Sequence, residues 1–277
     1  MNQMRVVIDL GDLAGRDQGA DSDQAALAVA EAVQRPTTRF VPPKSNEQLD
    51  LQALHRVRSR LVSQRTAVIN QIRGFLLERG IIVRQGLRFL RQLLPDILAK
   101  RTDVLSPRMV RIVSDLAGDW RQLDDRIETV TDEIETLAKA DDNCRRVMTV
   151  PGIGPIISSA MVAAIGNGSA FAKGRDYSAW LGLVPKQMST GDRTILGRLS
   201  KRGNSYLRML FIQAARVILV RPANWPKHGF GVWLVRAIQR LHPNVLAAAL
   251  ANKLARIAWT VLAQQRSYEA RVTKAEA

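Results

Sequence analysis

The chain has 277 residues, 46% of them hydrophobic and 5% aromatic, with one cysteine and a formal net charge of +16. This composition excludes an intrinsically disordered chain, an internal disulfide and a cysteine-rich metal site, and it suits helices packed through aliphatic side chains. No signal peptide opens the sequence and no apolar stretch approaches the ~18 residues of a membrane span, so we expect a cytoplasmic protein without membrane contact.

Residues 1–44 hold a short strand-like run, Arg5–Leu10, a stretch rich in glycine and aspartate, and a helical pattern at 25–33 that a proline ends. A proline-containing link then leads to Ser45, which suits the N-cap of a helix. From there to about Gly80 apolar residues recur at three- and four-residue steps. This spacing predicts a long helix.

A second long helix is predicted from Ser106, an N-cap candidate, with Pro107 at its first position. Its apolar residues recur with a period of about 3.5, which makes one seam along a helix of roughly thirty residues. The partner of this seam is either the segment 47–80, in an antiparallel hairpin, or a second subunit. We expect the hairpin, as a coiled-coil spacer over 45–142, together with assembly into a homo-oligomer. The seam positions are Met109, Ile112, Leu116, Trp120, Leu123, Ile127, Val130, Ile134 and Leu137.

Residues 143–277 are predicted to form a separate helical domain. The expected elements are a helical pair at 147–166, a loop-rich basic stretch at 167–203, an amphipathic helix at 204–220, a loop at 221–232 and a final helix at 244–265.

The whole positive charge lies in this second half. Residues 1–142 carry 21 Lys and Arg against 21 Asp and Glu, whereas 143–277 carry 20 against four. Such a field attracts polyanions, and phosphate neutralisation with release of counterions favours nucleic acid as the partner. A solvated basic surface and an anionic lipid surface remain open as alternatives.

The run Val150-Pro-Gly-Ile-Gly-Pro155 lies between two apolar helical segments, which is the pattern of a helix-hairpin-helix. Gly152 and Gly154 are expected to permit a tight turn, because glycine enters positive φ at little cost. The amides that open the second helix then bind a phosphate oxygen without reading base sequence. An ordinary glycine-rich turn is the alternative.

Small hydroxyl residues lie among glycines and cations between Gly182 and Arg208. This arrangement suits a phosphate-binding loop, or a serine nucleophile that attacks a phosphodiester with help from neighbouring guanidinium groups. The third interpretation is an ordinary turn whose arginines bind the DNA backbone. The candidate DNA-binding cations are Lys186, Arg193, Arg198, Lys201, Arg202 and Arg208.

Several ordered motifs resemble the DEDD-type insertion-sequence transposases of the insertion-sequence 110 family, which includes the Piv-like DNA invertases. The resemblance covers about residues 25–265, and its motifs are highly specific. They are Glu31-Ala-Val-Gln-Arg-Pro36, Arg39-Phe-Val-Pro42, Asp50-Leu-Gln-Ala-Leu-His-Arg56, Val150-Pro-Gly-Ile-Gly-Pro155, Ala179-Trp-Leu-Gly-Leu-Val-Pro185, Ser189-Thr-Gly191, Leu199-Ser-Lys-Arg-Gly-Asn204 and Tyr206-Leu-Arg208.

The resemblance implies a RuvC-like N-terminal domain, a coiled-coil spacer and a helical transposase domain that together move a mobile element. It also implies an element-encoded bridge RNA that pairs two DNA sites, and Mg²⁺ held by four acidic residues. A serine of the C-terminal domain is the family's proposed covalent nucleophile. By motif that serine is Ser189, with Ser200 as the weaker candidate.

The sequence departs from the family pattern at its front. Counted back from Glu31, the paired acids of the family fall on Ser22 and Ala25, with Asp21 and Asp23 only adjacent, while Asp9 resembles a first-strand acid. We therefore expect 1–44 to be a remnant of the RuvC-like domain and the chain to be an N-terminally truncated transposase. A non-enzymatic regulator that binds DNA or RNA is the alternative.

Overall fold

The computed structural model describes residues 27, 30–31, 43–100, 104–190 and 193–270. This part of the chain is mainly helical with one small two-stranded sheet, which confirms the predicted helical class. The chain divides into two compact units, one formed by residues 50–137 and the other by 1–49 together with 138–277. The strand-like run Arg5–Leu10 and most of the helix predicted at 25–33 lie outside the described residues.

Helix α2 (Asn46–Glu78) begins and ends where its sequence predicts. The Ser45 hydroxyl accepts a hydrogen bond from the Gln48 amide at 3.3 Å, and the Gln48 side chain accepts one from the Ser45 amide at 3.0 Å. This reciprocal pair is a capping box, which satisfies two amides that a helix start leaves free. At the other end Gly80 takes φ +73°, a left-handed conformation that terminates helices and favours glycine.

Helix α4 (Pro107–Ala140) confirms the second long helix, with Ser106 as its N-cap. Along the predicted seam Trp120, Ile127 and Ile134 are buried. The last seam position, Leu137, is 45% exposed, and the neighbouring Ala138 is buried in its place. The seam drifts because an α-helix turns every 3.6 residues and does not keep a 3.5-residue period over nine turns.

Helix α3 (Leu87–Lys100) has no counterpart among the predicted elements. Its buried residues Leu90, Leu94 and Ile97 recur at steps of four and three, so the helical signal was present in the sequence. Pro95 lies inside the helix, where proline normally disfavours helical structure. The three buried side chains join a core cluster with residues of α2 and α4, among them Ile72 and Val113.

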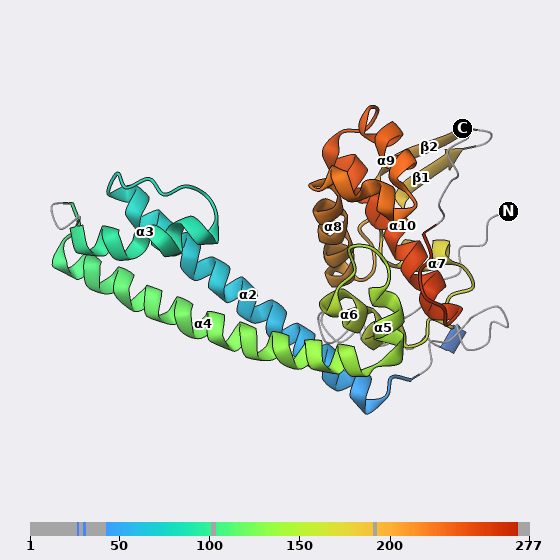
Figure 1. The fold of residues 1–277 in the computed structure, drawn as a ribbon, viewed down its shortest axis with the longest axis horizontal. Helices are drawn as coiled ribbons and strands as arrows, with labels where there is room; N and C mark the ends of the chain where they lie inside the picture. The colour runs from blue at the N-terminus through green and yellow to red at the C-terminus, as the bar shows by residue number, and fades with distance from the viewer. Residues whose placement is uncertain (1–26, 28–29, 32–42, 101–103, 191–192, 271–277) are drawn as a thin grey trace. The chain divides into compact units, whose positions relative to one another are not determined.

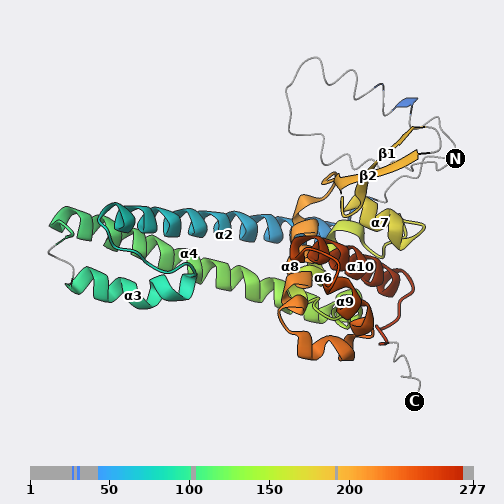
Figure 2. The same ribbon diagram turned by 90° about the horizontal axis from the view of Figure 1, so that it is seen from above.

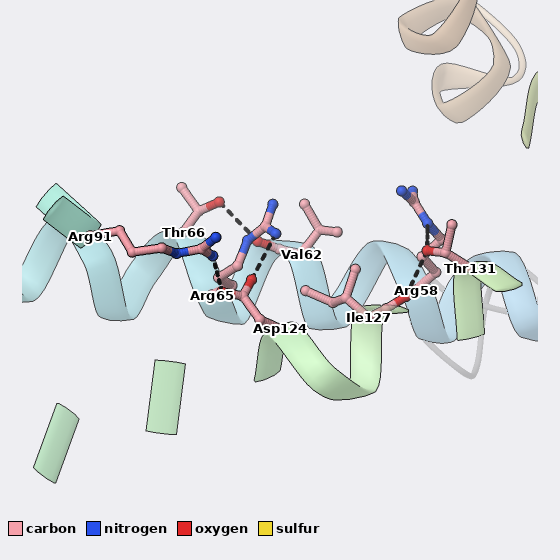
Figure 3. A network of polar contacts seen from close by, with 8 residues as sticks. All are labelled: Arg58, Val62, Arg65, Thr66, Arg91, Asp124, Ile127 and Thr131. Atoms are coloured by element: carbon pink, nitrogen blue, oxygen red, sulfur yellow. Dashed lines mark hydrogen bonds and ion pairs between the residues drawn. The ribbon is translucent and has the colours of Figure 1, made fainter. Parts of the chain in front are cut away.

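Helices α2 and α4 lie side by side and run antiparallel within the 50–137 unit (Figures 1 and 2). Arg58 donates to the Thr131 hydroxyl at 2.8 Å, and Arg65 donates to Asp124 at 3.0 Å (Figure 3). The two arginines are seven residues apart on α2 and their partners are seven apart on α4 in the opposite direction. The pairing predicted between these segments is therefore present within one chain, while supercoiling of the pair stays a prediction.

Asp124 of α4 lies between Arg65 of α2 and Arg91 of α3 (Figure 3). Its carboxylate is 3.0 Å from Arg65 and 2.5 Å from Arg91, and its side chain is only 22% exposed. Replacing Asp124 by asparagine leaves both guanidinium groups facing a neutral amide. We expect the free energy of unfolding to fall by about 1–2 kcal/mol, as measured by chemical denaturation.

The adjacent Asp125→Asn provides the control for this prediction, because Asp125 is exposed and the removed charge is the same. Its stability should stay within about 0.5 kcal/mol of wild type. Equal effects of the two substitutions would mean that general charge, and not the contact to Arg65 and Arg91, sets the stability of this region.

The other unit is built around helix α10 (Pro243–Ala263), which contacts α5 (Asp142–Met148), α7 (Gly174–Trp180), α8 (Ser205–Leu219) and α9 (Gly231–Ile238). The 3₁₀ helix η2 (Pro222–His228) lies between α8 and α9, and α6 (Pro155–Ile165) contacts both α5 and α8. The predicted helices at 204–220 and 244–265 match α8 and α10. The short helices α7 and α9 are absent from the predictions, since each spans only about two turns.

Helix α10 is also the one helix, among the described residues, that is long and apolar enough to cross a membrane. The expectation that no apolar stretch reaches this length was therefore wrong for this segment. Half of the apolar window is buried inside the protein, and Leu250, Leu254 and Leu262 are fully buried in the core. Its apolar character is explained by its central place in the fold.

The basic stretch 167–203, predicted to be loop-rich, contains a β-hairpin. Strands β1 (Pro185–Thr190) and β2 (Arg193–Leu199) pair antiparallel, with a register irregularity between Pro185 and Gln187. The missed signal is the two-residue turn Gly191-Asp192, with the β-branched residues Thr190, Thr194 and Ile195 around it, which favours a hairpin. The two turn residues, 191–192, lie outside the described residues.

Candidate nucleic-acid interface

The hairpin rises from a base in which two segments far apart in sequence are joined, 180–184 and 200–204. The Ser200 amide donates to the Val184 carbonyl at 2.8 Å, and the Lys201 amide donates to the Gly182 carbonyl at 3.3 Å. These two bonds lie just beyond the last strand pair, Pro185 and Leu199. They therefore hold the start of β1 and the end of β2 together.

Two glycines allow this close approach. Gly182 has φ +70°, and a Cβ added there would overlap the Arg202 carbonyl oxygen and lie 2.8 Å from the Arg202 amide nitrogen. Gly203 has φ +77°, and an added Cβ would overlap the Trp180 carbonyl oxygen. Both positions therefore require glycine for backbone conformation and for space. Lys201, between them, also has a positive φ of 54°.

Arg208, on the first turns of α8, ties the two segments together. Its Nη1 donates to the Leu181 carbonyl at 2.8 Å and to the Arg202 carbonyl at 3.1 Å. Burial lowers the pKa of its guanidinium group from the ordinary value. The sequence assigned Arg208 to DNA contact, yet in this structure one end of its guanidinium group holds the hairpin base.

Two asparagines complete the support of the base. Asn204 caps α8, its side-chain oxygen accepting from the Leu207 amide at 3.0 Å. Asn252 of α10 donates to the Leu183 carbonyl at 3.0 Å. Asn252 was not among the predicted site residues, because nothing in the spacing of α10 distinguishes it from a solvated polar residue.

Ser189 is the next-to-last residue of β1 and lies near the turn of the exposed hairpin. Its hydroxyl accepts a hydrogen bond from the Gln187 side-chain nitrogen at 2.9 Å. The residue is exposed, so the hydroxyl is open to a large substrate. Ser200, the weaker candidate, differs because its hydroxyl oxygen is buried and has no hydrogen-bond partner in the described part of the chain.

The candidate cations gather around this hairpin. Lys186 lies on β1, Arg193 and Arg198 lie on β2, and Lys201 and Arg202 follow β2 directly; all five are exposed. The described hairpin residues include no acidic side chain. The arrangement provides a dense positive surface next to an accessible hydroxyl group, which suits a phosphodiester substrate.

A cation outside the predicted set, Lys253, lies on α10. Its ammonium nitrogen lies 4.7 Å from the ring centre of Trp233 and 6.0 Å from that of Phe230. Burial and then the neighbouring Arg256 lower its pKa from the ordinary value. These ring contacts bring together residues from separate helices, so sequence spacing gives no signal for them.

The turn between α5 and α6 contains the two glycines of the predicted helix-hairpin-helix. Gly152 takes φ +79°, as expected, and an added Cβ would lie 2.8 Å from Ile218 of α8. Gly154 differs from the prediction, because its φ of −103° is extended backbone that any residue adopts. Gly154 is instead the N-cap of α6, and the Ile157 and Ser158 amides donate to its carbonyl.

No cluster of three or more His, Cys, Asp or Glu side chains suited to a metal ion occurs among the described residues. The predicted carboxylates Asp9, Asp21 and Asp23 lie outside them. His55 is buried, and burial followed by the charge of Arg58 lowers its pKa to about 4, so this imidazole is neutral near pH 7. Mg²⁺ remains an expectation from the family resemblance.

Comparison with known proteins identifies the class. Residues 144–228, which include the hairpin and its base, match the family model of the IS116/IS110/IS902 transposases. A "probable family 20 transposase" of Pseudomonas aeruginosa is 42% identical over 244 residues, covering 88% of this chain and 72% of that protein. The chain belongs to this transposase family.

Two further relatives carry names of insertion sequences. The transposase for IS1111A of Coxiella burnetii is 40% identical, over 88% of this chain and 66% of its own length. The transposase for IS1328 of Yersinia enterocolitica is 38% identical, over 86% of this chain and 70% of its own length. The chain thus spans about two thirds to three quarters of the length of these relatives, and the matched parts include the candidate interface.

Proposed function

We propose that this chain acts in DNA transposition, binding DNA through its basic second half and forming a covalent link to DNA through Ser189. Family membership supports DNA as the partner. The observation that carries the serine assignment is the exposed Ser189 hydroxyl on a hairpin whose strands hold three cations, Lys186, Arg193 and Arg198, against one acid in its sequence, Asp192 of the turn. The buried hydroxyl oxygen of Ser200 favours Ser189 over the alternative nucleophile.

The proposed step exchanges one phosphoester for another. The Ser189 oxygen attacks a DNA phosphorus and forms an oxygen–phosphorus bond, while one bridging oxygen–phosphorus bond of the DNA strand breaks. The serine hydroxyl loses its proton, and the released strand end takes up one proton to become a hydroxyl group. Cationic side chains brought close to the attacked phosphate stabilise the additional charge on its oxygens during attack. Attack by a free strand hydroxyl on the serine link reverses the exchange and joins DNA.

Three further contacts belong to this proposal. The run Val150–Pro155 acts as the turn of a helix-hairpin-helix, in which the amides that open α6 bind a phosphate oxygen. An element-encoded guide RNA and a second copy of the chain take part, as in the family that the sequence resembles. Exposed aliphatic side chains on the 50–137 unit, including Leu77 and Ile82, are consistent with assembly.

The test is to trap a covalent protein–DNA adduct. The full chain is incubated with labelled DNA from the ends of the element that encodes it, together with the RNA transcribed from that element, and the products are separated in detergent. Wild type and Ser200→Ala should give a labelled protein band, and Ser189→Ala should give none. An adduct that persists in Ser189→Ala removes this residue from the mechanism.

Thr194→Ala is the matched control, because Thr194 is paired with Ser189 across the hairpin and is equally exposed. It should retain the adduct. If wild type binds DNA tightly and gives no adduct under any condition, the chain acts as a non-enzymatic DNA-binding regulator. Binding to structured RNA that is far tighter than binding to duplex DNA would instead indicate an RNA-binding protein.

A further inference from the structure

The hairpin β1–β2 is almost entirely open to solvent. Every residue of β1 and every residue of β2 except Leu199 is exposed. An isolated two-stranded ribbon is marginally stable in water, since neither face removes apolar surface from solvent. Three large aliphatic side chains of this ribbon are nevertheless exposed, Met188 by 62%, Leu196 by 65% and Ile195 by 41%. A ribbon that exposes large aliphatic side chains on a transposase domain is shaped for contact with a partner.

The strand register divides the hairpin into two different faces. Residues directly paired across antiparallel strands share a face, and neighbours along a strand alternate between faces. Gln187 and Ser189 therefore lie on one face with Thr194 and Leu196, which agrees with the hydrogen bond between Gln187 and Ser189. We call this the serine face.

The opposite face, called here the cationic face, holds a different set of side chains. Met188 is paired with Ile195, and Thr190 is paired with Arg193. The register irregularity falls at Lys186, but a Cβ added at Gly197 would lie 3.7 Å from the Lys186 Cβ. Because Gly197 follows Arg193 and Ile195 at two-residue steps, Lys186 shares this face. An aliphatic pair thus lies between two cations. The acid of the hairpin sequence, Asp192, belongs to the turn outside the described residues.

The chemistry of the cationic face fits duplex DNA. Lysine and arginine complement phosphates, and the width of the major groove admits a two-stranded ribbon. Aliphatic side chains at that depth meet the thymine methyl group, and arginine pairs with guanine. Membership of a transposase family favours DNA over an acidic protein surface as the partner of this face.

We propose that the cationic face lies in the major groove of one DNA duplex, with Lys186 and Arg193 on phosphates or guanine and Met188 and Ile195 against thymine methyl groups. The serine face then points away from that duplex. The phosphate attacked by Ser189 therefore belongs to another strand or segment than the one held by the cationic face. This inference rests on the proposed role in DNA transposition. It adds that one face of the hairpin holds a DNA duplex while the other face carries the attacking serine.

The first experiment measures affinity and its salt dependence for a short duplex from the end of the element. The variant Lys186→Gln/Arg193→Gln should bind about tenfold more weakly. The slope of log affinity against log salt should fall by about 0.9 for each of the two side chains that contacts a phosphate. The serine-face control Thr194→Ala/Leu196→Ala should bind like wild type. Since all four side chains are exposed, unfolding midpoints should be equal across these proteins.

The second experiment tests the aliphatic pair with DNA in which uracil replaces thymine, which removes only the methyl group. Wild type should bind this duplex several-fold more weakly than thymine DNA, whereas Met188→Ala/Ile195→Ala should bind both equally. The inference is overturned if the cationic-face variants bind DNA like wild type, or if Met188→Ala/Ile195→Ala changes only the oligomeric state. Failure of wild type to bind any DNA would overturn the proposed function itself.

Discussion

Replacing Gly203 by alanine is expected to remove most of the stability of the unit that carries the hairpin. The new side chain would have to adopt φ +77° and would overlap the Trp180 carbonyl oxygen, which is backbone and cannot rotate away. The conformation alone costs about 1–2 kcal/mol, and displacement of the base adds several more. Because domains are stable by only about 5–15 kcal/mol, we expect a large fall in the thermal midpoint or loss of soluble protein.

The control for Gly203 lies in the hairpin itself. Gly197 has an ordinary φ, and a Cβ added there would lie 3.6 Å from the Lys186 carbonyl oxygen, which is normal contact. Gly197→Ala should therefore unfold within a few degrees of wild type, as followed by circular dichroism. Gly182→Ala should behave like Gly203→Ala, because its Cβ would overlap the Arg202 carbonyl. A stable Gly203→Ala protein with wild-type DNA affinity would refute the close approach of the two segments.

Arg208→Ala is expected to destabilise the same unit by about 2 kcal/mol or more. The substitution leaves the Leu181 and Arg202 carbonyls without their donor, and hydrogen bonds to charged groups contribute about 1.5–3 kcal/mol. Arg208→Lys should restore only part of the loss, because an ammonium group lacks the planar fork of arginine. Chemical denaturation measures both effects.

The salt dependence of DNA binding separates the two possible roles of Arg208. If it holds the hairpin base, the folded Arg208→Ala protein keeps the wild-type slope of log affinity against log salt. Arg202→Ala, whose side chain is exposed, should lower that slope by about 0.9 if it contacts a phosphate. If Arg208→Ala is as stable as wild type and lowers the slope, Arg208 contacts a phosphate, as its sequence position predicted, and does not hold the hairpin base.

The predictions for Gly203 and Arg208 concern residues of the family motifs and indicate a structural role for these motifs. Gly182, Gly203, Asn204 and Arg208 belong to the motifs that carry the resemblance, and each has a structural task at the hairpin base. The residues that the proposed function uses, Ser189 and the strand cations, lie beyond that base on an exposed ribbon. The motif residues therefore position a functional element that has little packing of its own.

Sequence alone determined the helical class, the long helices α2 and α4 with their caps at Ser45 and Ser106, and the transposase family. These features depend on contacts within a few residues or on ordered motifs, and both can be read along the chain.

Only the tertiary structure decided the arrangement of the candidate site. The hairpin register separates Lys186 and Arg193 from Ser189 by face, although all three are close in sequence. The role of Arg208 depends on carbonyls of residues 181 and 202, and that of Gly203 on the backbone of Trp180. The packing of α3 against α2 and α4 and that of Gly152 on α8 likewise depend on distant partners. Such contacts join segments far apart along the chain, and local propensity and spacing carry no information about which segments meet.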